Sequence, residues 1–174
     1  MELKSGKSSF YLIFFVSFSA FTFELLLTRI FSVLMWYHFA SLSIGVAMLG
    51  LGGGGILSYV LKDKLNERLI QRAFIFYFIA FLIIHSFFFY FHYYPEQITP
   101  FLAFFHQPYF QPFQRGVFFT LNFSTIIVLV MSYVVITIPF FLAGFIISSI
   151  FKINSKNTKL LYFYDLAGAS LSAL

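Results

Sequence analysis

The stretch from Phe10 to Leu61 limits what this chain can fold into more than any other feature. It contains two charged residues, Glu24 and Arg29, among 52 residues that are otherwise uncharged and mostly apolar or small. A water-soluble fold of this length cannot cover so many apolar side chains. Since a bilayer core about 30 Å thick takes roughly 20 apolar residues per crossing, the stretch predicts two membrane spans joined by a turn at residues 36–38.

Composition narrows the class of protein further. Hydrophobic residues make up 60% of the chain and charged residues 10%, which is typical of a membrane protein. The absence of cysteine excludes disulfides, thiolate nucleophiles and thiolate metal sites. The net charge is +5, and its basic residues form short clusters between apolar runs. Such clusters mark cytoplasmic loops, so the expected partner is the lipid bilayer and not a nucleic acid.

The apolar runs predict an all-α, polytopic helical membrane protein with four complete transmembrane helices and the start of a fifth. The first run is too long for a signal peptide, whose apolar core spans roughly 7 to 15 residues. The last run stops before it can cross a bilayer, so we expect this chain to be the amino-terminal fragment of a longer protein. The predicted segments are a tail at 1–9, a hairpin of spans one and two at 10–61, a basic loop at 62–72, span three at 73–91, an outer loop rich in proline and aromatic residues at 92–116, span four at 117–151 with a kink at Pro139, a basic loop at 152–159 and the start of span five at 160–174.

The distribution of Lys and Arg predicts the orientation of these spans. Nine of the eleven basic residues lie in the tail and the two basic loops, against one, Arg115, in the outer loop; the remaining one, Arg29, lies inside span one. Alternation of four spans puts the three basic segments on one face, which the positive-inside rule assigns to the cytoplasm. The amino terminus is therefore expected inside, in the inner membrane if the source is bacterial.

Four ionisable residues within the spans are candidates for a polar site: Glu24, Arg29, His85 and Asp165. A charge at the centre of a membrane helix costs about 2.5 to 3.5 kcal/mol on insertion scales, so each invites a functional explanation. Glu24 and Arg29 are separated by about 140° around the helix. One interpretation is that Arg29 extends to the interface while Glu24 is neutral or bonded to another helix. The other is a buried pair supported by His85 or Tyr133.

The histidines do not predict a metal or haem site. His85 and His92 share a helix face, and His38 and His106 lie elsewhere in the chain, but no spacing among them is diagnostic of a ligand set. A lone histidine in a membrane helix more often hydrogen-bonds to a neighbouring helix. We therefore expect no metal and no cofactor in this chain.

A glycine run in span two predicts close helix packing. It comprises Gly50, Gly52, Gly53, Gly54 and Gly55, which formally match the G-x-G-x-x-G dinucleotide fingerprint. That fingerprint requires a preceding strand and a phosphate in water, neither of which suits a membrane span. Glycines at helical spacing instead let another helix approach. The alternative is an unwound helix that lines a cavity, as in transporters.

Three sequence blocks carry a resemblance to a known family. They are ELLLTRIFSVLMWYHFASLSIGVAMLGLGGGG at 24–55, PFFLAG at 139–144 and LYFYDLAGA at 161–169, with matching positions at Glu24, Thr28, Arg29, Tyr37, His38, Gly50, Pro139, Gly144, Asp165 and Gly168. Together they resemble the membrane portion of bacterial multi-pass spermidine synthase-like proteins, in which spans precede a soluble aminopropyltransferase-like domain. The resemblance leaves residues 62 to about 131 unassigned.

The resemblance implies an anchoring role without catalysis by these residues. In that family the soluble domain would hold the nucleotide-type cofactor and the polyamine, so no catalytic residue carries over to this chain. We expect the spans to anchor or serve such a domain, with the downstream remainder of the protein as partner. The alternative is a small-solute transport module that uses Glu24, Arg29 and Asp165, or a structural membrane subunit.

The charge count yields a test of topology. A reporter fused after Lys64 or Lys156 is expected to show a cytoplasmic location, because both sites follow basic clusters. A reporter near Gln107 is expected outside. A cytoplasmic Gln107 fusion would contradict the four-span topology.

Overall fold

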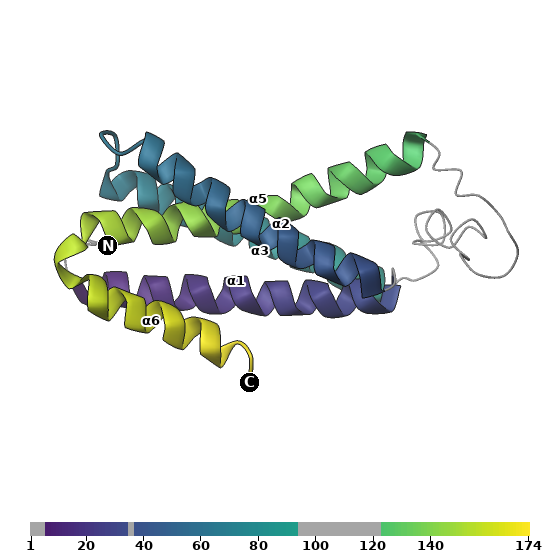
Figure 1. Cartoon of the computed structure of the whole chain (residues 1–174), viewed down its shortest axis with the longest axis horizontal. Coiled ribbons are helices and arrows are strands. Elements are labelled where there is room, and N and C mark those ends of the chain that lie inside the picture. The colour runs from purple at the N-terminus through teal and green to yellow at the C-terminus, as the bar shows by residue number, and fades with distance from the viewer. Residues whose placement is uncertain (1–5, 35–36, 94–122) are drawn as a thin grey trace, which may run out of the picture. The chain divides into compact units, whose positions relative to one another are not determined.

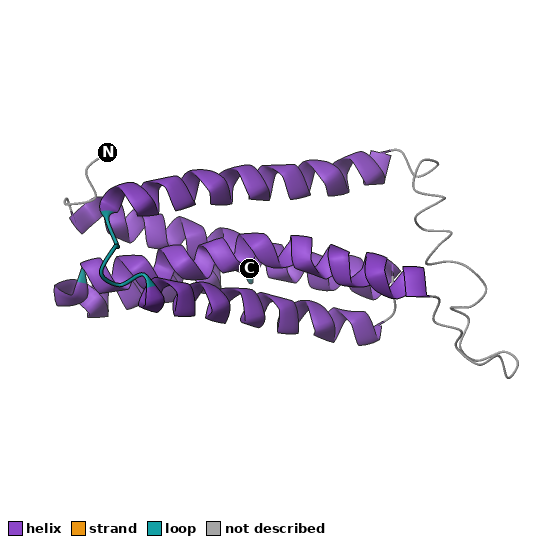
Figure 2. Ribbon diagram, turned by 90° about the horizontal axis from the view of Figure 1, so that it is seen from above, coloured by secondary structure: helices purple, strands orange, loops and turns teal. Residues whose placement is uncertain are grey.

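The computed structural model describes residues 6–34, 37–93 and 123–174, and these are helical apart from short connections (Figures 1 and 2). No strand occurs among them. The elements in chain order are α1 (Gly6–Leu34), α2 (Tyr37–Val60), α3 (Glu67–Tyr93), α5 (Phe123–Ile153), the 3-10 turn η2 (Ser155–Asn157) and α6 (Thr158–Leu171). Helices suit the apolar sequence because a chain in hydrocarbon must satisfy its backbone groups within each segment.

Four of these helices are long and apolar enough to cross a membrane, which confirms the predicted all-α polytopic architecture. The qualifying stretches are Ser8–Ile30, Ser41–Val60, Glu67–Ser86 and Tyr133–Ile153. The fifth helix, α6, has 14 residues and thus extends about 21 Å at 1.5 Å per residue. It is therefore shorter than the thickness of a bilayer core.

The element boundaries differ from the predicted segments mainly at α3. This helix begins at Glu67, six residues before the predicted start of span three, so the second half of the predicted basic loop is helical. An acidic residue in the first turn is favourable there because it opposes the positive end of the helix dipole. α1 begins at Gly6, inside the predicted tail at 1–9, and α2 begins at Tyr37, inside the predicted turn at 36–38. Residues 1–5, 35–36 and 94–122, which include most of the predicted outer loop at 92–116, lie outside the described residues.

The chain divides into two compact units, and the polar contacts between different helices lie in the first. The first unit consists of Met1–Ala80 and Thr137–Leu174, and the second of Phe81–Ile136. Within the first unit, α1 packs against both α2 and α6. The start of α1, the α2–α3 connection and the α5–α6 turn lie at one end of this unit (Figure 1). The basic segments at 62–72 and 152–159 belong to the second and third of these places.

The contact between α2 and α5 depends on glycine at three positions. A Cβ atom added at Gly54 would overlap the backbone carbonyl oxygen of Phe141 and approach the nitrogen of Phe145 at 2.5 Å. One added at Gly144 would lie 2.7 Å from Cα of Leu51, and one at Gly50 would lie 2.5 Å from the Phe140 side chain. Backbone atoms cannot move aside as flexible side chains do. The two helices therefore touch backbone to backbone, as small residues allow in membranes.

The other glycines of the run make looser contacts. A Cβ at Gly53 would meet only the ring of Phe141, at 3.2 and 3.3 Å, and Gly52 and Gly55 have nothing within 4 Å of that position. The helix α2 continues through the whole run without interruption. Close approach is thus concentrated at Gly50 and Gly54, which are four residues apart on one face.

Pro139 lies inside α5 and is buried there. Its ring removes one backbone N–H donor from the helix. The bend expected at this residue stays a prediction.

Adjacent glycines in α2 provide a matched test of this packing. Gly54→Ala is expected to destabilise the protein by about 1 to 3 kcal/mol, because the added methyl group forces α2 and α5 apart. Gly55→Ala makes the same chemical change in open space, where alanine favours the helix by up to about 1 kcal/mol. Unfolding in a mild detergent titrated with a denaturing one measures both. Equal stability of the two variants would contradict the close contact.

Candidate functional site

Small polar side chains at several points along α1 bond this helix to the other elements of the first unit. Thr28 Oγ1 and Ser43 Oγ of α2 are 3.0 Å apart, and Ser19 Oγ lies 2.6 Å from the Tyr77 hydroxyl of α3. At the start of α1, Asn154 Nδ2 donates to Ser9 Oγ over 3.2 Å. Hydrogen bonds of this kind between side chains of different helices help to hold membrane helices together.

Asp165 is bonded to α1 at the contact between α1 and α6. Ser17 Oγ donates to Asp165 Oδ1. One residue earlier, the Tyr164 ring stacks on Phe10 with centroids 5.3 Å apart. One turn later, a Cβ added at Gly168 would overlap the backbone of Phe14. Asp165 therefore has a structural partner, and it lies where α6 runs parallel to α1.

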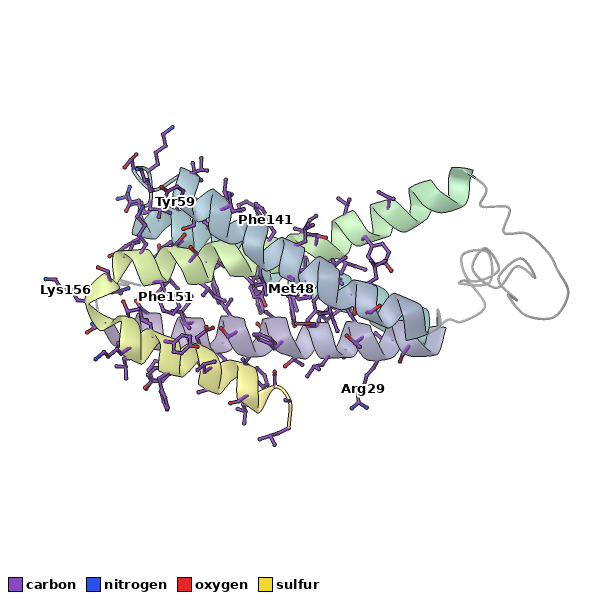
Figure 3. The ribbon with its side chains drawn as sticks, in the orientation of Figure 1. Arg29, Met48, Tyr59, Phe141, Phe151 and Lys156 are labelled. Carbon is purple, nitrogen blue, oxygen red and sulfur yellow. The ribbon has the colours of Figure 1, made fainter. Side chains whose placement is uncertain are left out.

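Glu24 and Arg29 do not form the local pair that the second interpretation required. No ion pair joins them in the part of the chain that the structure describes, because five residues of helix turn their side chains apart by about 140°. Arg29 is exposed and points away from the neighbouring helices of its unit (Figure 3). It lies five residues before the end of α1, and a long side chain such as that of Arg29 can extend along the helix toward the interface. Glu24 is half-buried.

His85 and Tyr133 belong to the second unit, so the structure does not test whether they support Glu24. The Nδ1 atom of His85 lies 3.0 Å from the carbonyl oxygen of Phe81, one turn earlier in the same helix. Its ring also packs on the Phe81 ring, with centroids 4.0 Å apart. Among the described residues, no three His, Cys, Asp or Glu side chains are grouped closely enough to hold a metal ion.

The polar residues that hold the helices together are mainly serines, which the sequence analysis did not identify. Ser58 and Ser149 are both buried, and their hydroxyl oxygens lie 3.0 Å apart between α2 and α5. Ser9, Ser17 and Ser43 are also buried. The available signal was the occurrence of serine within otherwise apolar spans. Sequence alone does not reveal which of these hydroxyls face one another.

Comparisons with known proteins add no relative. No model of a protein family matches the chain, and no curated protein or solved structure is significantly similar to it.

Two double-mutant cycles test this arrangement. Ser17→Ala and Asp165→Ala are expected to be non-additive by about 0.5 to 2 kcal/mol in the free energy of unfolding, because they remove the two ends of one hydrogen bond. Glu24→Gln and Arg29→Gln serve as the control cycle, and their effects are expected to add within about 0.5 kcal/mol. Coupling in the second cycle and none in the first would reverse the assignment of partners.

Proposed function

We propose that this chain is the membrane region of a bacterial spermidine synthase-like protein and that its helices anchor an aminopropyltransferase-like domain encoded downstream. The proposal places the chain in the bacterial inner membrane with its amino terminus in the cytoplasm. It assigns no catalytic residue to these 174 residues. The polyamine and the nucleotide-type cofactor would belong to the downstream domain.

The observation that supports this proposal is that residues of the three resembling blocks lie at helix contacts. Gly50 of the first block lies against Phe140 of the second, and Gly144 of the second lies against Leu51 of the first. In the third block, Asp165 and Gly168 lie against α1. Blocks that are far apart in sequence thus form the packing contacts of one unit. If this chain has the same membrane fold as the family it resembles, the residues at these packing positions would have to match those of the family.

The same contacts favour an anchor over a transport module. A transport site would gather Glu24, Arg29 and Asp165 around a solute. In the structure Asp165 is bonded to Ser17, while Arg29 points away from the other helices of its unit (Figure 3). The backbone contact between α2 and α5 also favours a rigid bundle, because packed helices that touch through glycine cannot slide without breaking that contact.

The complete gene product provides the test. We expect the reading frame or its immediate neighbour to encode further spans and a soluble glycine-rich αβ domain, and the product to stay in membranes after carbonate extraction. Proteoliposomes that contain the product are expected to take up no labelled putrescine. Uptake that is abolished by Glu24→Gln but not by Glu67→Gln would favour the transport module and overturn the proposal.

A further inference from the structure

One end of the first unit carries a concentration of exposed basic side chains. The Ser58–Ser149 contact of 3.0 Å brings the ends of α2 and α5 together there, and the Asn154–Ser9 bond of 3.2 Å brings the α5–α6 turn to the start of α1. Only two acidic residues, Asp63 and Glu67, lie in the same segments at 62–72 and 152–159. We call this region the basic end, and its described basic residues, all exposed, are Lys62, Lys64, Arg68, Arg72, Lys152, Lys156 and Lys159.

Within the basic end, the exposed ring of Tyr59, near the end of α2, lies three residues before Lys62. The Lys62 ammonium lies 5.8 Å from the centre of the Tyr59 ring, and Tyr59 is 72% exposed. The amide of Lys62 donates to the carbonyl of Tyr59 over 3.2 Å, so the helical turn continues between them. The lysine therefore extends beyond an outward-facing aromatic side chain.

A basic residue and an exposed aromatic residue also lie one helical turn apart on two other helices. On α3, Arg72 is four residues from Phe76, which is 62% exposed. On α6, Lys159 is four residues from Phe163, which is 63% exposed. Residues four apart share a helix face. In all three cases the cation lies nearer the basic end of the helix and the ring lies nearer the bilayer core.

This order matches the layers at a membrane surface. Aromatic rings favour the boundary between hydrocarbon and headgroups, and the aliphatic stems of Lys and Arg cover apolar surface while their charges stay in the polar layer. A phospholipid beside such a helix face places its acyl chain along the ring and its phosphate at the cation. Lys64, Arg68, Lys152 and Lys156, the other described basic residues of the basic end, have no exposed aromatic ring three or four residues away.

We propose that the basic end binds anionic phospholipid headgroups, and that Lys62, Arg72 and Lys159 are the residues that contact them. Charge alone would also attract a soluble acidic protein. A soluble acidic protein would not contact aromatic rings on the outward faces of membrane helices. Lipid is favoured because ring and cation recur together on three different helices.

The experiment compares two triple variants of the full chain reconstituted in bilayers of equal phosphatidylcholine and phosphatidylglycerol. After gentle extraction, mass spectrometry measures the enrichment of phosphatidylglycerol among the retained lipids. Lys62→Gln, Arg72→Gln and Lys159→Gln together are expected to lower that enrichment by at least about fivefold, since one basic residue near an anionic surface contributes on the order of a fivefold preference. The single variants are measured beside the triple, so that poor folding of the triple leaves three independent comparisons.

The matched control removes the same charges elsewhere in the basic end. It combines Lys64→Gln, Arg68→Gln and Lys156→Gln, again two lysines and one arginine, and it is expected to retain most of the enrichment. Equal losses in the two triple variants would show that net charge alone attracts lipid and would overturn the proposal. No enrichment in the unsubstituted protein would also overturn it and would leave a soluble acidic partner as the explanation for the basic end.

Discussion

The structure depends on a constraint that the bilayer imposes on helix association. Lipid tails are as apolar as leucine, so helices gain little by moving apolar side chains from lipid into contact with one another. They associate instead through close packing and polar contacts. The first unit shows both. α1 bonds to neighbouring elements through short hydroxyl side chains, such as Thr28 to Ser43 and Ser19 to Tyr77. α2 and α5 touch through glycine at Gly54 and Gly144.

These two kinds of contact complement each other along α2. The glycine contact removes side chains from the α2–α5 boundary, and the Ser58–Ser149 bond follows one turn after Gly54 on the same face. Only helices that approach this closely bring two serine hydroxyls to 3.0 Å. At Ser58 and Ser149 the shortness of the serine side chain is therefore as important as its polarity, because a longer polar side chain at either position would push the two backbones apart.

The sequence predicted the helices well because membrane insertion depends on length and hydropathy, which are local properties. It did not predict the Asp165 partner, since the Ser17–Asp165 bond joins residues 148 positions apart and depends on how α6 packs on α1. The sequence left open whether Glu24 and Arg29 form a pair; no ion pair joins them in the described part of the chain, where five residues of helix separate their side chains by about 140°. The glycine run was identified as a packing element. Which of its members touch α5 depends on the rotation of α2, which sequence does not specify.

The central claim, that short polar side chains meet between closely packed helices, is tested most directly by disulfide formation. The chain has no cysteine of its own, and Ser58→Cys with Ser149→Cys exchanges each hydroxyl for a thiol of similar size. A disulfide requires Cβ atoms about 3.5 to 4.5 Å apart, so mild oxidation in membranes is expected to link this pair rapidly. The control pair is Ser58→Cys with Ser148→Cys, in which the second thiol lies about 100° around α5 from position 149. This pair is expected to link slowly. Equal rates, or faster linkage of the second pair, would contradict the account.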